Sequence, residues 1–154
     1  MDRPTNQKEI DRIVGLQQPN GSFGYFHGLS VPTTSSLTTE QAMRRLKILG
    51  LTKDDEPTKR VIGYMHDCLK GKIRTIDRRE KVLNWDAFES FIMAVWLSIF
   101  EVDDSLADPV KDMWKDILKE AFETGEFDEN RYNGAYRKHI PVLNKGERLI
   151  DATC

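Results

Sequence analysis

Hydrophobic residues recur with the period of an α-helix along most of this chain, and turn or capping residues separate the periodic segments. No alternating run of β-branched residues interrupts them, so we expect no β-sheet. The pattern predicts an all-α fold of antiparallel helical hairpins with six or seven helices. The helices that we delimit cover residues 5–17, 38–50, 57–71, 84–100, 108–125 and 128–141.

Two of these helices begin with specific capping signals. Thr38 and Gln41 have the spacing of a capping box, in which each side chain binds the backbone amide of the other residue. Asp128 is a good N-cap, and Phe127 and Tyr132 flank it at the spacing of a hydrophobic staple. These signals fix the starts of the second and sixth helices.

The segment from Asn84 to Phe100, NWDAFESFIMAVWLSIF, has apolar residues in nearly every direction around a helix. A helix with a wet face does not have this composition, so we expect other helices to enclose it on all sides. Its small and polar positions form one stripe at a spacing of four residues, which allows a neighbouring backbone to come close: Asp86, Ser90, Ala94 and Ser98.

The segment from Gln17 to Pro32 contains three glycines and two prolines, which exclude regular structure. A loop of this length that also carries Phe23, Tyr25 and Phe26 is unlike an idle surface loop. These rings either pack into the core or form the wall of a site for an apolar ligand.

Composition limits the class of protein. The 154 residues suit a single domain, and 39% hydrophobic and 31% charged residues exclude a disordered chain. A net charge of −2 argues against a strongly basic nucleic-acid binder, and no uncharged run is long enough to span a membrane. The first 20 residues lack the apolar core of a signal peptide, so we expect a cytoplasmic protein with both cysteines reduced.

The chain ends in LIDATC, in which Leu149, Ile150 and Ala152 have the spacing of the first turn of an amphipathic helix. Two interpretations stay open. Either the chain is a fragment of a longer protein, or its last segment docks as a short tail.

Gln17, Gly21 and Phe23 in LQQPNGSFG resemble, in a Phe form, the Q-x-x-x-G-x-W motif of the terpenoid-cyclase and protein-prenyltransferase superfamily. The segment from Val31 to Leu51 also resembles the Thr-rich helix entry of that family. The resemblance covers residues 13–51 and implies part of an α/α-toroid. It further implies a structural role for the motif, with the Gln amide holding a helix start and the aromatic ring packed between repeats.

Glu101, Asp103 and Asp104 resemble the D-x-D-D acid motif of class II terpenoid cyclases, in which clustered carboxylates keep one aspartate protonated. Asp103, Asp104 and Asp108 also resemble the magnesium-diphosphate motif of class I synthases, which would make Mg²⁺ a cofactor. The alternative is a solvated connector, since acidic residues stabilise the start of the helix at Asp108.

Lys70 to Lys81 has a net charge of +4, from six basic and two acidic residues. Arg74, Arg78 and Arg79 could bind an anion such as a diphosphate, although a solvated loop has the same composition. The three histidines lie far apart and show no zinc-binding spacing, so we expect no metal site and no cofactor outside the cyclase alternative.

Three hypotheses for function follow. The first is a non-catalytic helical-repeat domain that binds an apolar ligand or a protein partner. The second is a terpenoid-cyclase-like enzyme fragment that uses the cluster Glu101 to Asp104. The third is a homo-oligomer, in which a second copy covers the open flank of a partial toroid. The sequence does not decide whether the chain is an enzyme.

Overall fold

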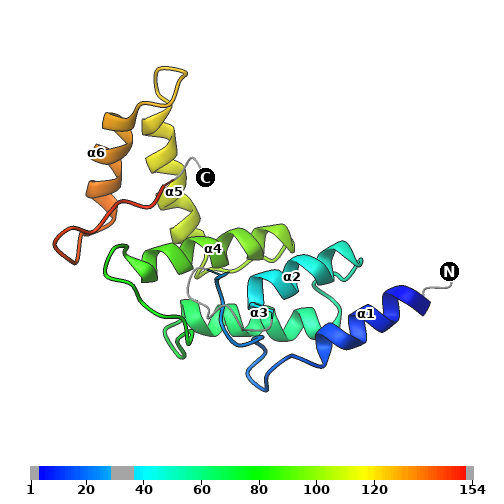
Figure 1. Cartoon of the computed structure of the whole chain (residues 1–154). Coiled ribbons are helices and arrows are strands. Elements are labelled where there is room, and N and C mark those ends of the chain that lie inside the picture. Colours follow the sequence, from blue (N-terminus) through cyan, green and yellow to red (C-terminus); the bar gives the residue numbers. More distant parts are fainter. Residues whose placement is uncertain (1–3, 29–36, 152–154) are drawn as a thin grey trace. The chain divides into compact units, whose positions relative to one another are not determined.

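The structure is a computed structural model that describes residues 4–28 and 37–151. These residues form six α-helices and no strand, which confirms the all-α class (Figure 1). Residues 29–36 and 152–154, which include Pro32, Ala152, Cys154 and much of the predicted Thr-rich helix entry, lie outside the described residues. The helices are α1 (Pro4–Val14), α2 (Thr39–Ile48), α3 (Glu56–Leu69), α4 (Trp85–Ile99), α5 (Asp108–Ala121) and α6 (Glu129–His139).

The contacts within the chain group into two compact units, although its length suits one domain. Unit 1 comprises residues up to 78 together with 100–102, and it contains α1, α2 and α3. Unit 2 comprises residues 79–99 and those from 103 onward, and it contains α4, α5 and α6. In each unit, helices that follow one another along the chain pack against one another. Such pairs agree with the predicted hairpins, whereas the partial α/α-toroid stays a prediction.

The core of unit 1 joins α1, α2 and the loop between them. Ile13, Phe23, Ala42 and Leu46 form a buried cluster. The predicted capping box starts α2: the Thr38 hydroxyl accepts the Gln41 amide at 3.2 Å, and the Gln41 side chain accepts the Thr38 amide at 3.0 Å. Helix α1 ends at Val14, three residues earlier than predicted, which frees the Gln17 side chain for contacts outside the helix.

The α5–α6 hairpin dominates unit 2, and its core contains Trp114, Ile117, Tyr132 and Tyr136. The Asp128 carboxylate caps α6 by accepting the backbone amides of Asn130 and Arg131, and the rings of Phe127 and Tyr132 lie 5.7 Å apart. Both the predicted cap and the predicted staple are therefore present.

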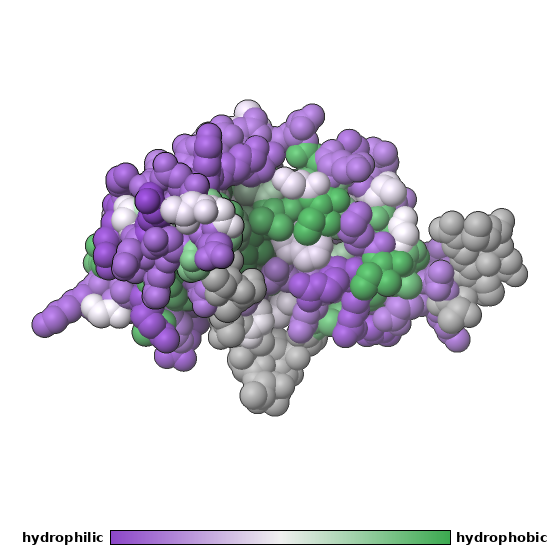
Figure 2. Space-filling model, turned by 90° about the horizontal axis from the view of Figure 1, so that it is seen from above, coloured by the Kyte–Doolittle hydropathy of each residue, from purple (hydrophilic) through white to green (hydrophobic). Residues whose placement is uncertain are grey.

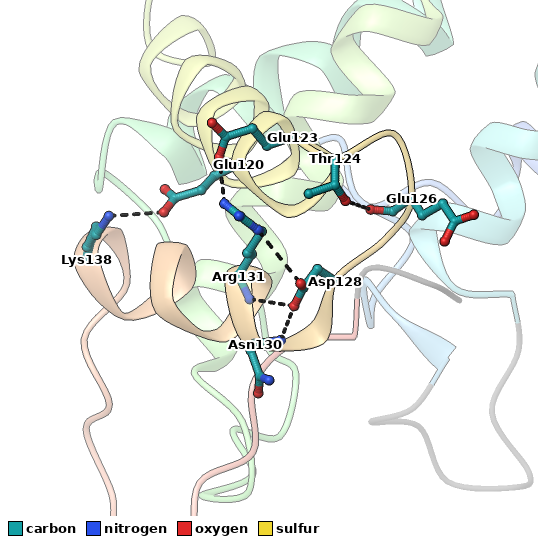
Figure 3. A network of polar contacts seen from close by, with 8 residues as sticks. All are labelled: Glu120, Glu123, Thr124, Glu126, Asp128, Asn130, Arg131 and Lys138. Atoms are coloured by element: carbon teal, nitrogen blue, oxygen red, sulfur yellow. Dashed lines mark hydrogen bonds and ion pairs between the residues drawn. The ribbon is translucent and has the colours of Figure 1, made fainter.

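Two ion pairs join α6 to the outer surface of α5 and to the turn that follows α5 (Figure 3). Arg131 reaches from α6 to Glu123 at 2.7 Å, and Lys138 reaches Glu120 at 3.1 Å. Both pairs are exposed, so they help to align the hairpin while its buried cluster supplies most of the stabilisation.

Helix α4 departs from the sequence-based expectation. Trp85, Met93 and Leu97 are buried, but Val95 is 40% and Ile99 38% exposed. The prediction that other helices enclose α4 on every side is therefore wrong. Its apolar residues outnumber the positions that its neighbours cover.

The segment after α6 docks along unit 2 instead of forming another helix. The Arg148 amide donates to the Val82 carbonyl at 2.7 Å, and the Tyr132 hydroxyl donates to the Ile150 carbonyl. Ile150 is 5% exposed and belongs to the core cluster of this unit. The residues up to Asp151 therefore dock as a tail, and the interpretation of the chain as a fragment stays a prediction.

No helix of the described residues is both long enough and apolar enough to cross a membrane.

Candidate functional site

A groove between α4 and α5 exposes apolar surface of unit 2, and we call it the α4–α5 groove. Its volume is about 410 Å³. The α4 wall consists of Phe91, Ala94, Val95, Ser98 and Ile99. The α5 wall consists of Lys111, Trp114, Lys115 and Leu118. All of these side chains recur at three- or four-residue intervals, so each helix presents one face to the groove.

Buried aromatic contacts hold the two walls together. The rings of Phe91 and Trp114 lie 4.5 Å apart, and Trp114 also lies 6.0 Å from Tyr136 of α6. Trp114 is 3% exposed. The groove therefore rests on a packed base and does not depend on a mobile loop.

The hollow of the groove lies over small side chains of α4. Ala94 and Ser98 lie one helical turn apart on the α4 wall, with the exposed side chains of Val95 and Ile99 beside them. Figure 2 shows that hydrophobic surface interrupts an otherwise mainly hydrophilic face of the molecule. Exposed apolar side chains beside a hollow make the groove our candidate binding site.

The charged side chains that line the groove, among the residues that the structure describes, are both basic. Lys111 and Lys115 are its only charged lining residues, and both belong to α5. The Lys111 ammonium lies 3.4 Å from the carboxylate of Asp108, and of the two side chains Asp108 is exposed and Lys111 partly buried. The groove thus combines an apolar floor with a basic rim.

The sequence analysis did not predict this groove. It singled out the stripe that contains Ala94 and Ser98, but it assigned Val95 and Ile99 to the core. The signal that could have located the groove is the position of Lys111 and Lys115 on the same helical face as Trp114 and Leu118.

The loop after α1 forms a tight junction with α3 in unit 1. The Gln17 side-chain amide donates to the carbonyls of Gly21 and Pro57 at 2.9 and 3.0 Å, and its oxygen accepts from Arg60 at 3.3 Å. Pro57 lies in the first turn of α3, so the amide holds a helix start. The ring of Phe23 is buried between α1 and α2 residues. Gln17 and Phe23 therefore have structural roles in unit 1, whereas the relation to the terpenoid-cyclase and protein-prenyltransferase superfamily stays a prediction.

The three aromatic residues of this loop do not form an open ligand wall. Phe23 and Phe26 are 4% and 0% exposed, while Tyr25 is partly buried. Asp77 fixes the segment, because its carboxylate accepts the amides of Phe26 at 2.6 Å and His27 at 2.9 Å. Phe23 and Phe26 therefore serve as core, and we place the proposed binding surface on unit 2.

The acidic motif has parts in both units: Glu101 belongs to unit 1, whereas Asp103 and Asp104 belong to unit 2. Asp103 is exposed, and Asp104 is 7% exposed. An Asp104 carboxylate oxygen accepts the Leu106 amide at 2.9 Å, and its carbonyl accepts the amides of Ala107 and Asp108. Asp104 thus organises the turn that precedes α5, but its burial differs from the solvated connector of the alternative interpretation.

The predicted anion site is likewise divided between the units. Arg74 and Arg78 are exposed residues of unit 1, whereas Arg79 belongs to unit 2. Arg79 lies 3.3 Å from the Asp86 carboxylate and 3.5 Å from that of Glu89, which is 4% exposed. Arg79 therefore neutralises a buried acid of α4. Nothing in these contacts gathers the three arginines around an anion.

Among the residues that the structure describes, no group of three or more His, Cys, Asp or Glu side chains is arranged to hold a metal ion. Asp103, Asp104 and Asp108 accordingly do not form the cluster that the class I motif needs. Cys68 is a partly buried residue of α3.

Comparison of the chain with models of protein families, with curated proteins and with solved structures gives no match.

Proposed function

We propose that this chain is a non-catalytic helical domain that binds a partner through the α4–α5 groove. The observation that carries the proposal is the exposure of Val95 and Ile99 beside the small side chains of Ala94 and Ser98. Covering one such aliphatic side chain gains about 1 to 2 kcal/mol, so a partner that covers both gains useful affinity. Grooves of a few hundred Å³ with apolar walls and few polar groups are typical of binding sites.

The contacts of the predicted site residues support a binding role over a catalytic one. Gln17, Phe23 and Asp77 hold the fold of unit 1 together, and Arg79 and Asp104 do so in unit 2. The groove, by contrast, contains surface that no element of the described chain covers. Its described lining residues include no carboxylate, thiol or imidazole that could activate the hydroxyl of Ser98 as a nucleophile.

Binding of an apolar fluorescent dye such as bis-ANS tests this proposal. The variant Val95→Asp/Ile99→Asp places two charges in the groove at positions that are already exposed, so its fold should survive. The matched control is Ile48→Asp on α2, because Ile48 is 78% exposed and lies outside the groove. We expect most of the dye fluorescence to disappear in the groove variant and to persist in the control. Equal fluorescence in the groove variant and the wild type would contradict the proposal.

The terpenoid-cyclase-like enzyme is the second hypothesis, and the burial of Asp104 is the observation in its favour. Incubation with prenyl diphosphates and Mg²⁺ tests it. Turnover by the wild type that is lost in Asp104→Asn, with unchanged helical circular dichroism, supports the enzyme. No turnover by the wild type removes it.

A further inference from the structure

We propose that the occupant of the α4–α5 groove is an amphipathic helix of another protein, with acidic residues beside its apolar face. This inference rests on the proposed binding function and adds the chemical class of the partner.

The shape of the groove suits a helix of about two turns. Its α4 wall runs from Phe91 to Ile99, a rise of about 12 Å at 1.5 Å per residue. The small side chains of Ala94 and Ser98 allow a neighbouring backbone to approach, while Val95 and Ile99 offer apolar contact beside them. An occupant that places apolar residues at i, i+4 and i+7 would match this length, as in other helix-in-groove complexes.

The two lysines of the groove favour an occupant that has acidic residues beside its apolar face. Lys111 and Lys115 lie one turn apart on α5, and the opposite wall from Phe91 to Ile99 carries no charge. Lys115 makes no ion pair within the described part of the chain, and the partner of Lys111 is the exposed Asp108. Carboxylates spaced one turn apart on the flank of an incoming helix would therefore meet both ammonium groups.

The same charges argue against a second copy of this chain in the groove. A two-fold contact would bring the lysines of one copy close to those of the other, and this repulsion disfavours association. The acidic neighbours on α5, Asp112 and Asp116, do not line the groove, so the two lysines are the charged groups that an occupant would contact directly.

Selection from a displayed library of helical peptides tests the inference with the full chain as the target. In the library peptides, the positions of the apolar face contain Ala, Leu, Ile, Phe or Met. The positions that flank this face contain Glu, Gln or Lys. We expect the enriched peptides to carry Glu on one flank. Fluorescence anisotropy then compares an enriched peptide with its Glu-to-Lys version, which we expect to bind about tenfold more weakly.

Two double variants locate the effect. Lys111→Glu/Lys115→Glu should reverse the preference between the two peptides. The matched control Lys119→Glu/Lys145→Glu should preserve it, since both of its positions are exposed and lie outside the groove. Raising the salt concentration should weaken the acidic peptide more than the version with lysine.

Three results would overturn the inference. In the first result, the enriched peptides show no preference for Glu but lose binding to Val95→Asp/Ile99→Asp. The groove would then still be a binding site, but its partner would not be acidic. Absence of enriched peptides would also remove the helical partner, and the dye experiment would then decide the binding function separately. If the mass in solution shows a dimer, and Val95→Asp/Ile99→Asp dissociates this dimer, the occupant is a second copy of the chain.

Discussion

Gly21 lies so close to α3 that a Cβ atom at this position would be 2.2 Å from the Arg60 carbonyl oxygen. Its backbone also has a φ of +94°, in the left-handed region that favours glycine. The loop after α1 and the middle of α3 therefore touch backbone to backbone, and the contacts of Gln17 surround this point.

Gly21→Ala should destabilise unit 1 much more than Gly24→Ala. Gly24 has nearly the same φ, +95°, but a Cβ there meets nothing within 4 Å. Gly24→Ala therefore measures the backbone strain alone, and we expect it to lower the free energy of unfolding by about 1 to 2 kcal/mol. We expect Gly21→Ala to lower the free energy of unfolding by at least about 2 kcal/mol more, because its Cβ atom would also clash with α3. Urea unfolding measures both values, and equal losses would show that the close contact with Arg60 is absent.

Replacement of Gln17 by Leu should lower the free energy of unfolding by about 1 to 3 kcal/mol. The change removes both donors and leaves the carbonyls of Gly21 and Pro57 without this partner in a partly buried site. Gln18→Leu is the matched control, because the Gln18 side chain is exposed and makes only one contact, of 3.5 Å, to Leu16. Thermal unfolding compares the two variants, and similar melting temperatures would contradict the role of Gln17.

Asp77→Asn should destabilise the segment around Phe26 by about 2 kcal/mol. Each carboxylate oxygen accepts one backbone amide, and an Asn side chain can provide only one acceptor for the two donors. Amide hydrogen exchange at Phe26 and His27 should become faster in this variant. Asp54→Asn, at an exposed position, is the control and should leave exchange at both amides unchanged.

Stability should fall at alkaline pH because of Tyr132. Burial, followed by the neighbouring Tyr136 and Asp151, raises the pKa of Tyr132 to about 12 from its ordinary value of 10.0. The unfolded chain therefore loses this proton at lower pH than the folded chain does. The stabilisation is complete below about pH 10 and disappears between about pH 10 and 12, an effect of up to about 2 to 3 kcal/mol.

Tyr132→Phe isolates this contribution. The variant loses the hydrogen bond from Tyr132 to the Ile150 carbonyl, so it should be less stable than the wild type at pH 8. The difference should shrink at pH 11, since Phe does not titrate. Denaturant unfolding at the two pH values checks the prediction, and an unchanged difference would contradict it.

The helices could be predicted because their signals are local. Thr38 with Gln41, and Asp128 with its flanking aromatic residues, contain the whole capping arrangement within a few positions of the sequence. The same is true of the α6 residues Tyr132 and Tyr136, whose burial follows from helical spacing.

The groove and the role of Asp77 could not be predicted in this way. Periodicity shows that Val95 and Ile99 are apolar, but their exposure depends on how many neighbours reach that side of α4. Asp77 lies in a basic segment that reads as a solvated loop, and its two partners, Phe26 and His27, precede it by about 50 residues. Such contacts depend on the tertiary fold and leave no local pattern in the sequence.

Methyl NMR spectra of the full chain, recorded during titration with an enriched acidic peptide, test the central claim most directly. The account predicts shift changes that concentrate on the methyl groups of Val95, Ile99 and Leu118, which line the groove. The methyl groups of Ile48 and Ile76, which are 78% and 63% exposed outside it, should stay unchanged. Shift changes at Ile48 or Ile76 with none at Val95 and Ile99 would contradict the assignment of the α4–α5 groove as the binding site.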